Sequence, residues 1–332
     1  MAKIHEQLTL EGFEAVLART EDPKERRRVI MAHEALSNEM DAIGYLHAGF
    51  CQASLPHRKP KDETAPWVRN NGKYQLVVRP GILPLRDGTV LDVGVPYGAK
   101  ARLIMIYLQT EARKTRSAHV DLGPSMSAWL RRLGLAPTGG ERGNYKPVRE
   151  QVLRIARSEF TLRTTTGPST AEISDQRLID GIKLWRDEED TPDLFRTGGE
   201  WVRFVRLTQS FFEHLMEHAV PLDEHAIAKL KNSALALDAY VWLVHRLHRL
   251  DKQTLVPWHA LSQHFGSVSE HRVLAFRLKE ALKDVMAVYP DANIEPTSKG
   301  LVLRPSAPAV PSNKHLVLRP VRGGSAGGSA GG

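Results

Sequence analysis

Residues 267–305 read SVSEHRVLAFRLKEALKDVMAVYPDANIEPTSKGLVLRP, and this stretch decides the expected fold of the C-terminal part of the chain. It predicts a helix followed by a two-stranded ribbon. At about 100° per residue, the helix gathers five apolar side chains on one side, namely Leu274, Leu278, Ala281, Leu282 and Val285. Arg272, Lys279 and Lys283 fall together on the opposite side. The three cations on the side away from the core raise the question of what they bind.

Two apolar patterns precede this stretch. Residues 231–250 carry a long apolar stripe at helical spacing, and residues 256–266 predict a short second helix that ends at Gly266. The expected order is therefore two helices, a third helix and a ribbon. This is the order of a winged helix, a variant of the helix-turn-helix.

The same order of elements is expected earlier in the chain. The predicted elements are a strong helix over residues 98–115, a strand over 118–123, a brief helix over 125–135 capped by Ser125 and stopped by Gly134, a helix over 146–158, and a β-ribbon that opens at 159–167 and returns through 171–185 and 201–208. The two copies agree in element order and not letter by letter. They predict two modules without a sequence repeat.

The third helix of the earlier module also turns cations outward. Projection of its residues buries four apolar side chains, those of Val148, Val152, Ile155 and Ala156. It leaves outside Lys146, Glu150, Arg154 and Arg157, with Arg149 at the edge. Residues 140–165 hold six bases and three acids, so positive charge is concentrated here.

The N-terminal part is less regular. Its expected features are one long helix or two over residues 22–51 with Pro23 in the first turn, an exposed basic connection over 52–73, and a hairpin of two strands, 74–81 and 89–96, around a turn at Asp87 and Gly88. The chain closes with a Pro-rich stretch and a Gly/Ser/Ala run that resembles an engineered linker. We leave this tail out of the functional interpretation.

Together these patterns predict an α+β fold, mainly α, with two tandem winged-helix domains behind an N-terminal helical extension. The predicted units are N-terminal helices and a basic loop over residues 1–72, a first winged-helix domain over 73–219, a second over 220–306, and a disordered tail over 307–332. The second unit is compact, whereas extra strands and helices lie beside the first. We therefore expect the first unit to mediate self-association in a homodimer.

Composition narrows the class of protein. Hydrophobic residues make up 42% of the 332 residues, and no apolar run approaches the roughly 20 residues that a membrane helix needs. The first residues lack the apolar core of a signal peptide, so we expect a cytoplasmic protein without membrane contact. The single Cys51 excludes an intramolecular disulfide and a cysteine-based zinc site. The net charge of +8 favours a polyanionic partner.

The outward cations of the two third helices suit double-stranded DNA. A helix fits the major groove, a guanidinium group can read guanine or hold phosphate, and a wing can grip the neighbouring backbone. The alternative is that both faces are ordinary solvated helix surfaces. Arg272, near its helix start, is expected to read a base, and Lys279 and Lys283 are expected to hold phosphates. The candidate DNA contacts are Lys146, Arg149, Arg154, Arg157, Arg163, His271, Arg272, Lys279, Lys283 and Lys299.

Motifs for catalysis, cofactors and metals are missing. The sequence has no phosphate-binding G-x-x-x-x-G-K-[ST] loop, no G-x-S-x-G elbow and no H-x-H pair beside a tyrosine. His214 and His218 are four residues apart. His47, Cys51 and His57 form a loose cluster. Neither set gives three or four ligands at a familiar zinc spacing, so we expect no catalytic residue, no cofactor and no metal.

Four segments carry a family resemblance. They read IGYLHAGFCQASLPHRKP from Ile43, VGVPYGAKARLIMIYLQTEARKT from Val93, LGPSMSAWLRRLGL from Leu122 and SALALDAYVWLVHRLHRL from Ser233. With them, residues 42–305 resemble the RepA replication initiators encoded by plasmids of Gram-negative bacteria. The resemblance implies a tandem winged-helix protein that binds origin repeats in double-stranded DNA and opens the duplex. It also implies recruitment of host replication proteins, namely the host initiator and the replicative helicase.

Three hypotheses follow. The first is a non-enzymatic replication initiator that binds direct repeats at its origin. The second is a transcriptional repressor without initiator activity, which predicts one palindrome beside a promoter. The third is an enzyme such as a nuclease or primase, which needs carboxylate or histidine clusters that the sequence lacks.

Overall fold

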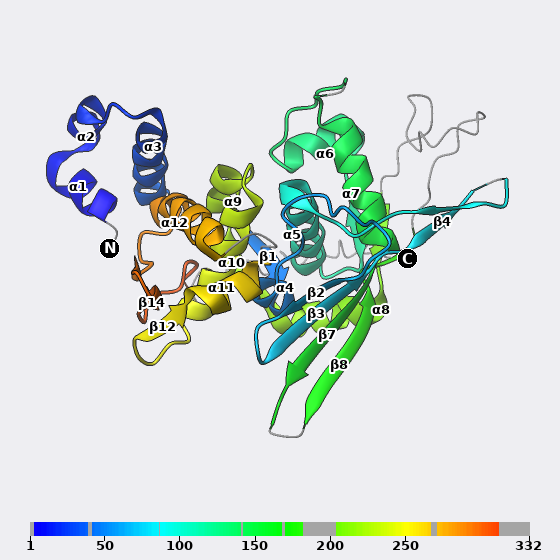
Figure 1. Ribbon diagram of the computed structural model, residues 1–332. Coiled ribbons are helices and arrows are strands. Elements are labelled where there is room, and N and C mark those ends of the chain that lie inside the picture. The colour runs from blue at the N-terminus through cyan, green and yellow to red at the C-terminus, as the bar shows by residue number, and fades with distance from the viewer. Residues whose placement is uncertain are drawn as a thin grey trace, which may run out of the picture.

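Helices and small antiparallel sheets alternate along the chain in the computed structural model (Figure 1). More of the described residues lie in helices than in strands, which agrees with an α+β class in which helices predominate. The structure describes residues 3–38, 42–85, 87–140, 142–167, 170–181, 204–266 and 271–311.

Three short helices form the N-terminal extension. They are α1 (Lys3–Glu11), α2 (Phe13–Arg19) and α3 (Pro23–Ser37). The predicted start of α3 is confirmed, with Pro23 at its first position. The Asp22 carboxylate accepts hydrogen bonds from the backbone N–H groups of Lys24 and Glu25, both at 2.9 Å, and so caps the helix.

Strand β1 (Ile43–His47) lies where the sequence predicts more helix. It pairs antiparallel with β11 (Ala219–Asp223), and the short helix α4 (Ala48–Gln52) follows it. All residues of β1 are buried, and a Cβ on Gly44 would lie 3.2 Å from the Cδ1 atom of Ile227. The prediction of helix is therefore wrong for residues 43–47 and right for residues 48–51, because a short apolar run fits a fully buried strand as well as a helix.

Helix α5 (Gly98–Thr115) is the central helix and covers the predicted residues. It packs beside β1. The Oε1 atom of Gln109 accepts a hydrogen bond from the His47 N–H at 2.7 Å, and the Oγ1 atom of Thr110 accepts one from the Tyr45 N–H at 2.8 Å. The β1–β11 sheet has only two strands, so these side chains satisfy backbone groups that a third strand would otherwise bond.

A four-stranded antiparallel sheet carries the ribbon of the first predicted module. Its order is β2-β3-β7-β8, formed by β2 (Trp67–Asn70), β3 (Tyr74–Arg79), β7 (Glu159–Thr165) and β8 (Ala171–Arg177). The predicted pairing of residues 159–167 with the segment after residue 170 is confirmed. In Figure 1 the β7–β8 end of this sheet extends away from the helices.

The predicted hairpin around Asp87 and Gly88 exists, but its first strand differs. The turn joins β4 (Ile82–Pro84) to β5 (Val90–Asp92), whereas β3 pairs with β2 and β7. The predicted strand is interrupted at Gly81, which separates β3 from β4. A Cβ on Gly81 would lie 2.0 Å from the carbonyl oxygen of Arg157. The expected single strand over residues 74–81 is therefore wrong in its pairing with residues 89–96.

Both inner helices of the first module are confirmed. Helix α6 (Met126–Arg132) begins after Ser125, whose hydroxyl accepts a hydrogen bond from the Ala128 N–H at 3.2 Å. Gly134 follows the helix with a φ of 69°, a left-handed conformation that favours glycine. Helix α7 (Tyr145–Arg157) is the third helix of this module.

The predicted last strand of the first ribbon belongs to another sheet. Strand β10 (Phe204–Leu207) lies between β6 (His119–Asp121) and β9 (Ile179–Gly181), and it does not pair with β7 or β8. The prediction that the ribbon returns through residues 201–208 is wrong for the strand at 204–207. Residues 182–203 lie outside the described part of the chain.

The C-terminal module has the predicted element order and one more strand. Its elements are α10 (Ala234–Leu247), β12 (Thr254–Pro257), α11 (Trp258–Phe265), α12 (His271–Val288), β13 (Ile294–Pro296) and β14 (Gly300–Leu303). The sheet order β12-β14-β13 ties the ribbon to the strand that precedes α11. Gly266 ends α11 as predicted, with a φ of 65°.

One apolar core runs through both predicted modules, including Trp129 of the first and Tyr240 of the second. Helices α8 (Gln209–His218) and α9 (Glu224–Leu230) flank β11 between them. The division at residues 72, 219 and 306 therefore stays a prediction about independent folding. Residues 307–311, which the sequence assigns to the tail, lie against β1, where Val310 is 1% exposed.

Candidate nucleic-acid interface

Helix α12 turns the predicted apolar side to the core. The side chains of Leu278, Leu282 and Val285 are fully buried, and those of Leu274 and Ala281 are nearly so. The helix packs on α9, α10 and α11 with this side. The projection of the sequence onto a helix is therefore confirmed for the buried half of α12.

Two of the predicted cations on α12 have described side chains, and both have partners. The ammonium group of Lys279 lies 5.2 Å from the centre of the Trp258 ring, a cation–π contact. Lys283 is exposed and forms ion pairs with Glu280 at 2.8 Å and with Glu25 of α3 at 3.8 Å. The side chains of His271 and Arg272 lie outside the described residues, so base reading by Arg272 stays a prediction.

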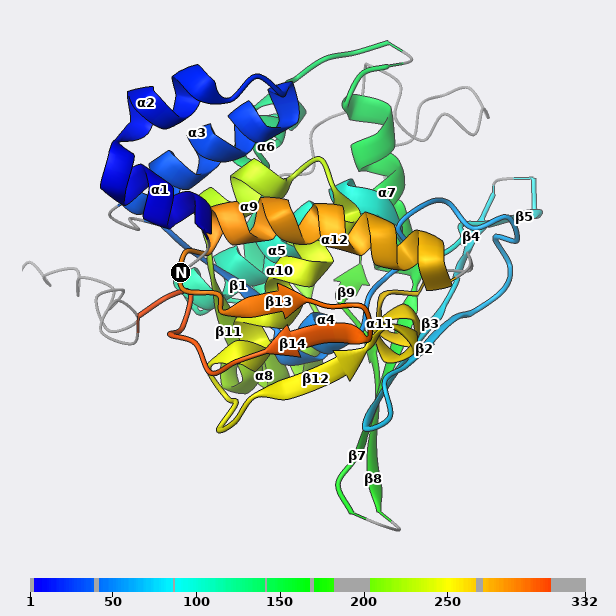
Figure 2. The ribbon, with the colours of Figure 1, turned by 60° about the vertical axis from the view of Figure 1, so that its left-hand side comes forward.

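Helix α3 covers the C-terminal half of the outward side of α12 (Figure 2). Arg28 of α3 is buried and donates hydrogen bonds to Asp284 at 2.7 Å, to Glu280 at 3.2 Å and to Glu25 at 2.5 Å. Burial opposes the charge of Arg28, but the three carboxylates outweigh it and raise the pKa of its guanidinium. This Arg28 cluster occupies the C-terminal half of the outward side, where Lys283 stays exposed, and leaves the N-terminal half open at the residues that the structure describes there.

The sequence interpretation missed the residues at the centre of that open half. Phe276 is 69% exposed, Val273 is 39% exposed, and Arg277 is also exposed. The projection that selected Lys279 already puts Phe276 opposite Val285. The prediction considered only cations on the side that faces solvent and therefore did not include this aromatic residue.

The ribbon behind α12 is short and tightly held. Lys299 is exposed in the turn between β13 and β14. The turn closes through a hydrogen bond from the Thr297 N–H to the Gly300 carbonyl at 2.8 Å, and the Trp258 indole N–H donates to the Thr297 carbonyl at 3.1 Å. A Cβ on Gly300 would lie 2.2 Å from the Val256 carbonyl oxygen, so only glycine fits there.

Arg154 of α7 is not on the outside, which corrects the prediction. Its side chain is 4% exposed. The guanidinium pairs with Glu63 and with Glu150, the latter at 2.9 Å, and donates to the Val95 carbonyl at 3.2 Å. Its charge is therefore used inside the protein.

The reason lies in the β4–β5 hairpin, which covers this side of α7. Leu153 packs in a small apolar cluster with Leu83 of β4 and Val93 after β5. The Nε and Nη2 atoms of Arg157 donate to the Ile82 carbonyl at 2.8 and 2.5 Å. The sequence could not predict this cover, because hairpin and helix are far apart in the chain.

The remaining candidates of the first module lie at two separate places. Lys146 is exposed and Arg149 half-buried in the first turns of α7, and Arg163 is exposed on β7. Val148, Ile155 and Ala156 are buried and Val152 is half-buried, which confirms these four residues as part of the inner side of this helix. The cations at the start of α7 therefore lie at the surface, whereas those at its end are bound by other groups of the protein.

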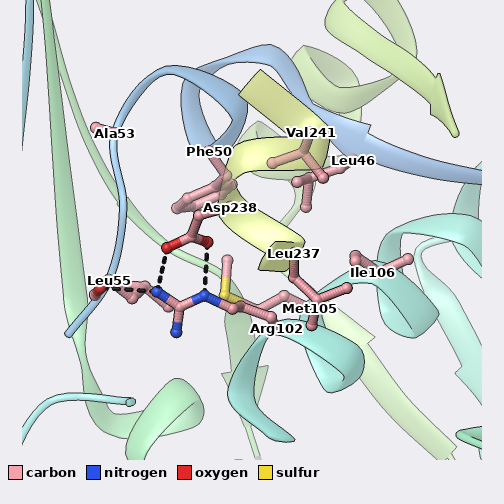
Figure 3. A pocket seen from close by; sticks show the side chains of 10 residues that line it. All are labelled: Leu46, Phe50, Ala53, Leu55, Arg102, Met105, Ile106, Leu237, Asp238 and Val241. Carbon is pink, nitrogen blue, oxygen red and sulfur yellow. Dashed lines mark hydrogen bonds and ion pairs between the residues drawn. The ribbon is translucent and has the colours of Figure 1, made fainter. Parts of the chain in front are cut away.

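A buried ion pair joins the helices that carry the two modules (Figure 3). Arg102 of α5 donates to both carboxylate oxygens of Asp238 of α10, each at 2.6 Å, and to the Leu55 carbonyl at 2.7 Å. The Nε2 atom of His57 lies 2.9 Å from the same carboxylate. Burial opposes ionisation of Asp238, but Arg102 and His57 hold the pKa of its carboxyl below its usual value.

This pair lines a cavity of about 20 Å³, which is large enough for about one water molecule and for no ligand. The other lining side chains drawn in Figure 3 are apolar, among them Phe50 and Val241. We therefore interpret the Arg102–Asp238 pair as a junction that fixes α5 against α10.

The structure brings together histidines that the sequence placed in separate sets. The Nε2 atom of His47 lies 3.0 Å from the Nδ1 atom of His214, and the His218 ring contacts both. Burial, followed by the neighbouring His214 and His218, lowers the pKa of His47 to about 3. Within the described ranges, no group of three or more His, Cys, Asp or Glu side chains could hold a metal ion.

Comparison with protein families finds a match for the central part of the chain. Residues 95–259, from the start of α5 through both inner helices of the first module to α11, match the family model for the plasmid encoded RepA protein. The chain is therefore similar to the plasmid-encoded RepA family over about half of its length. The resemblance predicted from the sequence is confirmed, and the match includes α7 but ends before α12.

Two crystal structures of domains 2 and 3 of RctB are similar to this chain. One, a selenomethionine derivative, has a TM-score of 0.48 and 15% sequence identity and covers 71% of this chain and 83% of that chain. The other has a TM-score of 0.47 and 16% identity and covers 76% and 94%. A search of curated proteins finds no match. Among the described residues, no helix has the length and apolar character needed to cross a membrane.

Proposed function

We propose that this RepA-like protein initiates plasmid replication by binding repeats of double-stranded DNA at its origin. In this proposal the units around α7 and α12 are winged-helix modules, and α7 and α12 are their recognition helices. The observation that carries it is α12: a helix with a buried apolar half, an N-terminal half on which Arg277 is exposed, and a short ribbon behind it. The family match supports the plasmid context.

The contacts of the cations favour α12 as the stronger DNA-binding element. Arg277 is exposed on its outward side and Lys299 is exposed on its ribbon. In the first module the exposed Lys146 and Arg163 remain candidates, whereas Arg154 is buried and the half-buried Arg157 is held by the Ile82 carbonyl. Phosphate contacts need a cation that reaches the backbone of DNA, and a buried guanidinium cannot do so.

Origin opening, recruitment of the host initiator and the replicative helicase, and homodimerisation through the first module are parts of the same proposal. So are a cytoplasmic location and the absence of enzymatic activity. Sedimentation of the full chain across a concentration series tests the dimer. Incubation of labelled origin DNA with protein and Mg²⁺ tests catalysis, and cleavage or extension products would contradict a non-enzymatic initiator.

Footprinting on the plasmid's own origin is the decisive experiment. We expect protection of several tandem repeats and a steep loss of affinity with salt, because phosphate contacts release counterions. Protection of one palindrome beside a promoter, with replication intact when the gene is deleted, would favour the repressor. Affinity that is equal for origin and random duplexes would remove sequence-specific binding from the proposal.

A further inference from the structure

Phe276 lies on the side of α12 that faces away from the core, where an aromatic side chain adds little to the stability of the fold. It is nine residues from the buried Val285, which at about 100° per residue puts the two side chains on opposite sides of α12. Its side chain is 69% exposed, and Val273, nearly one turn earlier, is 39% exposed. A buried aromatic side chain is a large source of stability, so an exposed one on this side gives the fold little.

The surroundings of Phe276 are cationic. Arg277 is its exposed neighbour in sequence, and Lys279 lies nearly one turn further along. The carboxylates on this side of the helix, those of Glu280 and Asp284, are both bound by Arg28 of α3. In Figure 2 the helices α1 to α3 gather at the C-terminal end of α12 and leave its other end clear of them.

We propose that Phe276 and Val273 contact the C5-methyl groups of thymine in the major groove, so that the second module reads thymine-bearing steps. This inference rests on the proposed function, and it assigns part of the specificity to apolar side chains, in addition to the base reading predicted for Arg272. Thymine is the only base of DNA that presents an apolar group in the major groove, and Phe is among the residues that contact it.

The chemistry of this surface favours DNA over a protein partner. Protein-binding patches are typically contiguous apolar areas of a few hundred Å². Here two apolar side chains lie near cations, on a helix whose acids Glu280 and Asp284 are already paired with Arg28, Lys283 and Arg27. Such a surface complements the charge of a polyanion, with the cations on phosphates and the apolar centre on base edges.

The test uses the full chain and a duplex that contains its footprinted repeat. Each thymine is replaced in turn by deoxyuridine, which removes only the C5 methyl group. For the wild type we expect a roughly fourfold loss of affinity at one or two positions, the effect of losing one methyl-sized contact. Phe276→Ala should lower affinity by roughly tenfold and abolish the sensitivity to deoxyuridine at those positions. Phe276→Leu, which keeps an apolar side chain, should retain part of both.

Leu10→Ala is the matched control, because Leu10 on α1 is 84% exposed and lies outside this surface. It should keep wild-type affinity and the same response to deoxyuridine. The proposal is overturned if deoxyuridine never matters, or if Phe276→Ala and the wild type respond to it equally. Loss of self-association by Phe276→Ala with unchanged DNA affinity would also overturn it and assign the surface to a protein. If the wild type binds no duplex at all, the proposed function itself fails.

Discussion

Helices α7 and α12 hold the same place in the two modules, and in each the C-terminal half is covered by an added element. The β4–β5 hairpin covers α7, and α3 covers α12. The charges are used in opposite ways. On α7 the cation lies on the helix itself, and Arg154 binds a carboxylate and a carbonyl from other parts of the chain. On α12 the cation, Arg28, lies on the covering helix α3 and binds carboxylates of α12.

The comparison shows that a basic helix face in a sequence does not distinguish cations that stabilise the fold from cations that stay on the surface. On α7 much of the positive charge stabilises the fold. On α12 the acids are neutralised and cations such as Arg277 stay on the surface. We therefore expect α7 and α12 to respond differently to the same kind of substitution, and the junction between their modules to matter most for stability.

The largest effect is expected at the junction that holds the two modules together. Arg102→Ala leaves Asp238 buried without its main partner, and removal of one member of a buried ion pair costs about 3–5 kcal/mol. Urea unfolding, followed by circular dichroism, measures the loss. Arg131→Ala, an exposed arginine on α6, serves as control and should change the free energy of unfolding by less than about 0.5 kcal/mol.

A second pair of variants compares the two helices directly. Arg154→Ala removes a buried cation whose partners Glu63 and Glu150 are about one third exposed, so we expect a loss of about 2–3 kcal/mol in the free energy of unfolding. Arg277→Ala should leave stability within about 0.5 kcal/mol and weaken origin binding. If Arg154→Ala unfolds like the wild type and only loses DNA affinity, the contrast between the helices is wrong.

Arg154 also marks the limit of what the sequence can predict. Local periodicity correctly gave α5, α7, α12, the β7–β8 and β13–β14 ribbons and the buried side of α12, because these depend on near neighbours in the chain. The sequence could not give the partner of Arg154, since Glu63 is 91 residues away and reaches it only through the fold. The same holds for Arg28 on α12 and for β1, whose strand conformation depends on β11.

A third, smaller effect separates base contacts from phosphate contacts on α12. Arg272→Ala should cost about 1–3 kcal/mol on the origin repeat and relax specificity, whereas Lys279→Ala should weaken binding to all duplexes and reduce the salt slope by about one. Lys283→Ala should reduce the slope less, because Glu280 and Glu25 already pair with Lys283. Affinities for origin and random duplexes across a salt series measure all three. Equal slopes for all variants and the wild type would mean that this side of α12 is merely solvated.

The smallest effect is a shared response of both modules to acid. The backbone N–H of Gly49 donates to the Nδ1 atom of His47, so protonation of that buried nitrogen breaks a hydrogen bond. The pKa of His47 is about 3 in the folded chain and about 6.5 when unfolded, so its contribution to stability is complete above pH 6.5 and falls as the pH drops below that value. We expect His47 to account for a loss of about 1 kcal/mol between pH 7.5 and 5.5, in addition to the losses from His245 and His264, whose pKa values burial lowers to about 4.

Urea unfolding of the wild type and of His47→Gln at both pH values measures this loss, which the variant should not show to the same extent. His259, exposed on α11, gives the control substitution His259→Gln, which should keep the wild-type pH dependence. His47 lies on β1, in the core that both modules share, so acid should shift one cooperative transition. Two separate transitions, with only one of them sensitive to His47→Gln, would mean that the modules carrying α7 and α12 fold independently and that the comparison between them concerns two domains and not one body.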